Sequence, residues 1–314
     1  MDWVGLRKWF LVLSLGMILP GVIFLILAPG LRQGIDFTGG SSLTIQFAEP
    51  VTQEDLRAGL TAIGVEGVTV QRLGDDSYFI RTKELSETER DDLLFGIQRA
   101  LGTSGVELLA FDLVSPVLAR DVIIKGFWAV FAAVIGIFLY MWWAFRNMSS
   151  PFRYGAAAIL ALVHDTLIVV GVFAILGVVA DIEVNTMFLI ALLTTIGFSV
   201  NDTIVVFDRL RENVSFFPGR TLSANVNLSI SETFSRSVNT SATLLVTILA
   251  LLLFGGPTIR DFLLVLLIGV AVGTYSSIAV ASQFLVLWDQ FGMGWPFNRK
   301  QIPTETGRTK AATN

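Results

Sequence analysis

The chain has 314 residues, 53% of them hydrophobic and only 15% charged, and its formal net charge is −4. Soluble domains of ordinary composition are less apolar and more charged. No basic block interleaved with aromatic residues occurs, so nucleic acid is not an expected ligand. The absence of cysteine excludes disulfides, thiolate metal sites and a thiol nucleophile. We therefore expect an integral membrane protein.

Six apolar runs are long enough to cross a bilayer, because a spanning helix needs about 20 predominantly apolar residues. Their predicted limits are residues 9–29, 122–145, 152–179, 184–207, 237–255 and 262–288. The first run lacks a small-residue cleavage site, so we interpret it as an uncleaved anchor. The segments between and around the spans are predicted to be an N-terminus (1–8), an outer domain (30–121), a loop (208–236) and a tail (289–314).

Lysine and arginine predict the orientation, because cytoplasmic loops carry an excess of them. Arg7 with Lys8, Arg146 with Arg153, and the basic residues of the 208–236 loop and of the tail all fall on one side. The loop at 180–183 on the other side has two acidic residues, Asp181 and Glu183, which we expect to be solvated. Both termini, the 208–236 loop and the tail are therefore predicted to be cytoplasmic.

The outer domain has the pattern of a folded α+β unit. Four segments alternate like strands, at residues 42–48, 68–73, 78–82 and 106–113. Thr52 is placed to cap a helix over 53–63, and Ser86 with Glu89 forms a capping-box start for a second helix. The resulting βαββαβ order is typical of the ferredoxin-like fold. Because no nucleophile and base or metal cluster is visible, a binding or mechanical role is expected rather than catalysis.

A carboxylate in the fourth span is the leading site candidate, because charge inside a bilayer is costly and usually functional. Thr195, Ser199 and Asp202 share one helical face, and Asn201 lies on an adjacent face. Burial raises the pKa of a carboxyl group and a nearby cation lowers it, so Asp202 is suited to proton relay. The alternative is that Asp202 only holds helices together by hydrogen bonds.

Polar residues also mark the third and fifth spans. Arg236 opens the fifth span, Thr240 and Thr243 continue its stripe, and the arginine could pair with Asp202. In the third span, His164 and Asp165 lie roughly 18 Å along the helix, near the bilayer centre. Adjacent residues point about 100° apart, so we do not expect these two to serve one narrow site. For His164, a purely structural hydrogen bond is as well supported by the sequence as a functional role.

Two further patterns are interpreted as structural. The sixth span has a ridge of small residues typical of helix packing: Gly269, Gly273, Ser277 and Ala281. Residues 221–235 carry apolar side chains on one face, which predicts a separate amphipathic helix at the cytoplasmic interface. The polar tail after Asp289 is predicted to be disordered.

The segment directly after the first span reads GIDFTGG and contains Gly34, Asp36, Gly39 and Gly40. It resembles the motif that opens the outer domain in the SecD/SecF protein-export family. Residues 191–213 resemble the family's fourth span, and Arg236 with 239–243 and 254–257 resembles its fifth span and the following turn. The His164-Asp165 pair has the family's form as well. Ser115-Pro116 departs from it, because the family reads Gly-Pro there. One outer domain of modest size favours the SecF branch.

This resemblance implies a polytopic α-helical membrane protein that forms half of an RND-type 12-helix core. It implies an auxiliary, non-enzymatic translocase subunit in the bacterial cytoplasmic (inner) membrane, surrounded by lipid. With SecD it would use the proton motive force to promote preprotein translocation beside the SecYEG channel, with YajC and YidC as further partners. Asp202 would carry the proton, with Arg236 as its partner and a second carboxylate on SecD. No cofactor besides the proton is implied.

Two other functions stay open at the level of sequence. One is a scaffold that holds translocase components together without transport. The other is an RND-type exporter of small molecules, although one outer domain and six spans are half of the duplicated set. An ATPase is excluded because the sequence contains no phosphate-binding loop.

Overall fold

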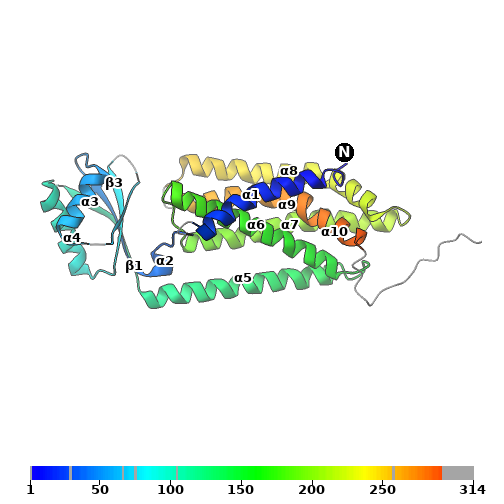
Figure 1. Ribbon diagram of the computed structural model, residues 1–314, viewed down its shortest axis with the longest axis horizontal. Helices are drawn as coiled ribbons and strands as arrows, with labels where there is room; N and C mark the ends of the chain where they lie inside the picture. The colour runs from blue at the N-terminus through cyan, green and yellow to red at the C-terminus, as the bar shows by residue number, and fades with distance from the viewer. Residues whose placement is uncertain are drawn as a thin grey trace, which may run out of the picture.

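The computed structural model describes residues 2–27, 30–65, 67–73, 76–103, 105–256 and 259–291. A long bundle of helices carries the outer domain at one end (Figure 1). Among the described residues, six helices are long and apolar enough to cross a membrane. The predicted fold class is confirmed. Most of the predicted tail, from residue 292 onward, lies outside the described residues.

The bundle consists of six long helical segments. They are α1 (Arg7–Leu27), α5 (Pro116–Ala144), α6 (Phe152–Val179), α7 (Thr186–Phe216), α8 (Leu222–Phe254) and α9 (Arg260–Ser276), the last continuing through the π-helical η2 (Ser277–Ala281) into α10 (Ser282–Gln290). Half of the apolar stretch is buried in α6, α7 and the α9–α10 segment, and far less in α1, α5 and α8. The inner three therefore form the core, and the outer three expose apolar side chains such as Phe127, Trp128 and Trp143.

Helix α8 is longer than the span predicted at residues 237–255. Its 33 residues extend about 50 Å, whereas the hydrocarbon core of a bilayer is about 30 Å thick. The expected interfacial helix at 221–235 is the first part of α8, because no glycine or proline interrupts residues 222–254. Its apolar side chains Val226 and Ile230 are fully buried in the bundle core instead of lying along an interface.

The outer domain contains β1 (Gly40–Phe47), α3 (Gln53–Ala62), β2 (Thr69–Arg72), β3 (Ser77–Thr82), α4 (Glu87–Leu101) and β4 (Val106–Val114). The strand order is β2-β3-β1-β4 with antiparallel neighbours, which is the predicted ferredoxin-like arrangement. Alternate residues of β1 point into the core, where Leu43 and Ile45 are fully buried. The domain ends at Val114, because α5 already starts at Pro116.

Both predicted helix caps of the outer domain are present. The Thr52 side chain accepts a hydrogen bond from the Asp55 backbone N–H at 3.1 Å. Ser86 and Glu89 form a capping box, in which the Ser86 N–H donates to the Glu89 carboxylate at 2.8 Å. These bonds satisfy backbone donors that would otherwise have no partner at the helix start.

Candidate functional site

Asp202 lies in the middle of α7 and is only 6% exposed. The Ser237 hydroxyl, from α8, donates to its Oδ1 at 2.8 Å. The Ser277 hydroxyl, at the start of the π-helical turn η2, lies 3.4 Å from its Oδ2 and also donates to the Thr274 carbonyl at 2.9 Å. Each carboxylate oxygen therefore has one hydroxyl nearby, a close donor from α8 and a weaker contact from η2. The carboxylate is held at the junction of α7, α8 and η2.

Arg236 does not contact Asp202. Its side chain is exposed, and no ion pair between the two is present among the residues that the structure describes. Ser237, the next residue, holds the carboxylate because consecutive positions of a helix point about 100° apart. The sequence prediction chose the charged residue and missed both serines. Ser277 could have been noticed, since it lies on the small-residue ridge of the sixth span.

The other polar residues on the outer face of the bundle are exposed. Thr240 and Thr243 donate to backbone carbonyls of their own helix, at Arg236 (2.9 Å) and Thr240 (2.8 Å). Asn201 is exposed next to Asp202 on α7. Arg236, Thr240 and Thr243 thus form a polar stripe along α8 that this chain leaves uncovered.

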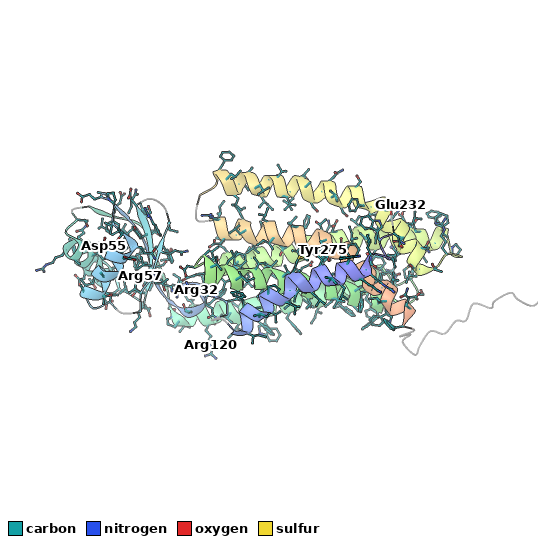
Figure 2. All side chains as sticks on the ribbon, turned by 45° about the horizontal axis from the view of Figure 1, so that its top comes forward. Arg32, Asp55, Arg57, Arg120, Glu232 and Tyr275 are labelled. Carbon is teal, nitrogen blue, oxygen red and sulfur yellow. The ribbon has the colours of Figure 1, made fainter. Side chains whose placement is uncertain are left out.

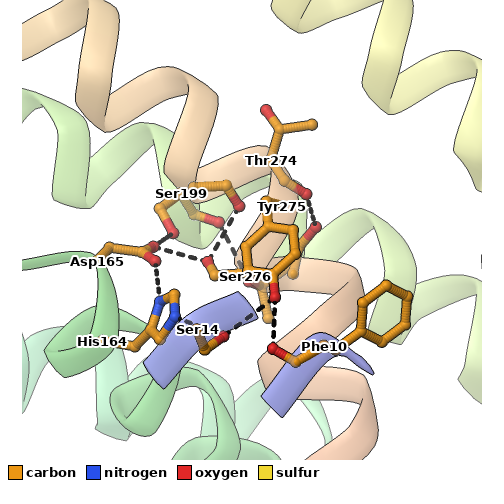
Figure 3. A network of polar contacts seen from close by, with 11 residues as sticks. Phe10, Ser14, His164, Asp165, Ser199, Thr274, Tyr275 and Ser276 are labelled. Atoms are coloured by element: carbon orange, nitrogen blue, oxygen red, sulfur yellow. Dashed lines mark hydrogen bonds and ion pairs between the residues drawn. The ribbon is translucent and has the colours of Figure 1, made fainter. Parts of the chain in front are cut away.

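A second buried carboxylate, Asp165 of α6, belongs to a network of polar contacts with α7 and α9 (Figure 3). Ser199 and Ser276 donate to its Oδ2 at 2.6 and 2.7 Å. Its Oδ1 lies 2.9 Å from Nδ1 of His164. The expectation that these neighbours cannot share a site is wrong, because the side chains bend toward each other although their Cα–Cβ bonds diverge. Ser199 is predicted to lie beside Asp202, but its hydroxyl donates to Asp165 instead.

The small-residue ridge fixes how α9 packs on α7. A Cβ on Gly269 would collide with the side chain of Thr195, and one on Gly273 would lie 2.8 Å from Cβ of Ser199. Thr195 is buried there and donates to the Leu192 carbonyl at 2.9 Å, so it does not reach Asp202. Further along the ridge, Ser277 contacts Asp202 and Ala281 is fully buried. Close packing thus brings Ser276 and Ser277 to the two carboxylates.

The motif after the first span joins the outer domain to the bundle. A short helix, α2 (Ile35–Thr38), places the Asp36 carboxylate at the start of α7, where it accepts the Thr186 backbone N–H at 2.7 Å. Gly39 and Gly40 have φ of +73° and +125°, and a Cβ on Gly40 would lie 2.6 Å from the Thr82 carbonyl oxygen. The Gly34 N–H donates to the Val184 carbonyl at 2.8 Å. This motif therefore contacts the helix that carries Asp202.

The sequence predicts a solvated loop between α6 and α7, but both acidic residues of this loop form ion pairs. Asp181 forms an ion pair with Arg32, which lies where the outer domain meets the helices (Figure 2). Glu183 pairs with Arg81 of β3 at 3.1 Å, and its side chain is 14% exposed. Burial raises the pKa of Glu183, and the nearby Arg81 and Arg32 partly offset that rise. These ion pairs border a cavity of about 260 Å³ between domain and bundle.

This geometry can bind and release protons. Two carboxylates and an imidazole are buried in a membrane-spanning bundle, and the described residues contain no cluster of three or more potential metal ligands. The helix with Asp202 also contacts the outer domain through Asp36. The fold and the site together define a multi-pass membrane protein with protonatable groups in its core and one α+β domain at one end.

The comparisons with known proteins identify its family. The family model "Protein export membrane protein SecD/SecF, C-terminal" matches residues 97–290, and the model "SecD/SecF GG Motif" matches residues 24–51. Protein translocase subunit SecF of Thermobaculum terrenum is 45% identical, covering 92% of this chain and 94% of the relative. SecF of Anaerolinea thermophila is 37% identical over 91% and 93%. The chain belongs to the SecD/SecF family and to its SecF branch.

Solved structures agree with this assignment. SecDF of Thermus thermophilus, described as a translocon-associated membrane protein, matches with a TM-score of 0.80 and 33% identity over 92% of this chain. SecDF in a "Super-membrane-facing form" matches with a TM-score of 0.63 and 34% identity. The present chain spans 39% of each of those chains.

Proposed function

We propose that this chain is the SecF-type subunit of the Sec protein translocase and that, with SecD, it couples proton movement to preprotein translocation. Asp202 is the proton-carrying carboxylate. The observation that carries this proposal is a carboxylate buried inside a six-helix membrane bundle, with one serine hydroxyl on each of its oxygens. Such a group can hold its proton or release it without a large rearrangement, because hydroxyls serve as donors or acceptors.

The uncovered stripe on α8 supports a protein partner within the membrane. Arg236, Thr240 and Thr243 lie on one face of a spanning helix and are exposed in the isolated chain. A guanidinium facing hydrocarbon is costly, whereas one facing a partner's polar side chains is stabilised. We expect this partner to be SecD, because the present chain spans only 39% of the SecDF chains that it resembles and the remainder has to come from another chain. Arg236 would then act toward a SecD carboxylate.

A route from Asp202 to the outer domain supports the coupling step. The dipole of α7 favours negative charge at its first turn, and Asp36 supplies that charge from the outer side. A shift of α7 on protonation of Asp202 would move the Asp36 contact and the domain behind it. The outer domain faces the extracytoplasmic side and both termini are cytoplasmic, as the distribution of lysine and arginine indicates.

Other partners follow from the family. SecYEG, the translocating preprotein, YajC and YidC are proposed as contacts, and lipid surrounds the exposed apolar faces of α1 and α5. The exporter alternative is weakened by the family match over residues 97–290, which include five of the six long helical segments. The scaffold alternative remains, and it predicts that the charge of Asp202 is dispensable.

The test is Asp202→Asn in membrane vesicles that contain SecD, SecYEG and the motor, with preprotein translocation measured with and without a proton motive force. Asparagine keeps the shape of the side chain and can still accept from a serine. We expect Asp202→Asn to lose the stimulation by the motive force, while the ATP-driven stage persists. The matched control is Asp208→Asn on the same helix, where the carboxylate is half exposed and paired with Arg211. Equal stimulation in both variants would refute the relay and favour the scaffold.

A further inference from the structure

A chain of polar contacts links His164 to α1, on the side of the histidine away from Asp165 (Figure 3). The His164 Nε2 lies 3.0 Å from the Ser14 hydroxyl of α1. That hydroxyl lies 3.1 Å from the hydroxyl of Tyr275 on α9. The Tyr275 hydroxyl in turn donates to the Phe10 backbone carbonyl of α1 at 2.8 Å. Tyr275 and His164 thus both contact α1, and Ser14 joins them.

Counting hydrogens along this chain identifies the donor between His164 and Ser14. Each hydroxyl has one hydrogen to donate. Tyr275 uses its hydrogen on the Phe10 carbonyl, because a carbonyl only accepts. Ser14 must then donate its own hydrogen to the Tyr275 oxygen. Only lone pairs of Ser14 remain for His164, so Nε2 must carry a hydrogen and donate it.

The other ring nitrogen shares a proton with Asp165. Nδ1 lies 2.9 Å from Oδ1 of Asp165, and the hydrogen between them is either on Nδ1 of an imidazolium beside a carboxylate or on Oδ1 beside a neutral ring. In both forms the pair holds one proton more than a carboxylate beside a neutral histidine with its hydrogen on Nδ1. The pair has no net charge, and the Ser199 and Ser276 hydroxyls satisfy the second carboxylate oxygen. A neutral, fully hydrogen-bonded pair is the form in which charged groups are tolerated inside a membrane.

We propose that the His164–Asp165 pair is a second proton-binding site of this chain, and that the proton on His164 Nε2 determines how α1 is held. When this proton leaves to water, Nε2 becomes an acceptor and Ser14 turns its hydrogen toward it. The contact between Ser14 and Tyr275 then has no hydrogen and is lost. Since α1 leads directly toward the outer domain, this site acts on the domain through a different helix from Asp202. This second proton-binding site goes beyond the proposed function, which rests on Asp202.

The two sites are adjacent yet separately held. Two consecutive serines at the junction of α9 and η2 divide them, since Ser276 donates to Asp165 and Ser277 contacts Asp202. The titratable groups facing His164 are Asp165 on α6 and Tyr275 on α9, with Asp202 on α7 reached across those serines. The other charged residues on the elements that pack against α6 lie near helix ends: Arg7 and Lys8, Arg120, Asp121 and Lys125, Asp208, Arg209, Arg211 and Glu212, Arg260 and Asp261, and Asp289.

The test uses the fact that His164 is the only histidine in the chain. The full chain, made with a histidine-free affinity tag and ¹⁵N-labelled histidine, is placed in lipid bilayers, and the imidazole nitrogens are observed by NMR at pH 7. We expect Nε2 to carry a hydrogen. A ring with its hydrogen on Nδ1 alone at pH 7 in the unmodified protein would overturn the proposal without any variant.

Three variants sharpen the result. Tyr275→Phe frees the Ser14 hydrogen to donate to Nε2, so the ring should carry its hydrogen on Nδ1 alone at pH 7. Asp165→Asn removes the carboxylate that shares the extra proton, and the ring should place its single hydrogen on Nδ1, toward the amide oxygen. Asp202→Asn, the control, should keep the hydrogen on Nε2. Retention of the Nε2 hydrogen in both Tyr275→Phe and Asp165→Asn would overturn the proposal. Its loss in Asp202→Asn would show one shared site rather than two. Loss of translocation in Asp202→Asn bears only on the proposed function.

Discussion

Helices α1 and α6 approach each other at Gly21 and Gly171, where an added Cβ on either glycine would meet the backbone of the other. A Cβ added to Gly21 would lie 2.5 Å from the Cα of Gly171. Carbon atoms in contact prefer about 3.5–4.0 Å, so the helices would have to separate by about 1 Å. No rotamer change relieves this clash, because the obstacle is backbone. We expect Gly21→Ala to lower the free energy of unfolding by about 1–3 kcal/mol.

The assay is thermal unfolding of the purified chain in detergent, where each kcal/mol corresponds to roughly 2–4 °C in Tm. Gly16→Ala is the control, because it makes the same change on the same helix with nothing within 4 Å of the new Cβ. That variant should match the unmodified protein or exceed it by up to about 1 kcal/mol, since alanine favours helix over glycine. A Tm for Gly21→Ala equal to that of Gly16→Ala would refute the packing argument.

Three further predictions concern helix starts and use the same unfolding assay. Asp36→Ala removes the acceptor for the Thr186 N–H and should cost about 0.5–2 kcal/mol, with partial recovery in Asp36→Asn; an unchanged Tm would contradict the cap. Hydrogen bonds from Ser86 lower the pKa of Glu89, so the ionised carboxylate stabilises the folded state. This stabilisation is present above the ordinary glutamate pKa and is lost as pH falls through the lowered pKa. Glu89→Gln should remove this part of the acid dependence of Tm. Ser115→Ala should cost about 0.5 kcal/mol because the bond to Leu118 N–H is long (3.4 Å), whereas Ser115→Gly should cost only a few tenths.

Local patterns predicted the architecture well. The length of apolar runs depends on bilayer thickness alone, so all six spans were visible without knowing what packs against them. The outer domain was equally readable, because burial on one face forces the alternation in β1 and the caps at Thr52 and Ser86 use neighbours three residues away. The predicted fifth span was shorter than α8, because a change from apolar to polar residues resembles a helix end even where no glycine or proline interrupts the helix.

The partners of the buried carboxylates could not be predicted in the same way. Charge attraction pointed to Arg236 for Asp202, yet the rotation of α8 against α7 presents Ser237 instead. That rotation is set by packing between helices, which one helix's periodicity does not contain. Asp36 and Thr186 are 150 residues apart, and no local pattern relates them. The sequence thus located Asp202 by the cost of its charge, and only the fold revealed the groups that hold it.

We propose that Asp202 carries protons through a bundle completed by SecD. The most direct test of this proposal is proton entry into vesicles that contain this chain and its SecD partner, followed with an internal pH-sensitive dye after an imposed pH difference. We expect proton entry with the unmodified chain and with Asp208→Asn, and its loss with Asp202→Asn. Proton entry at the same rate with Asp202→Asn would contradict the proposal.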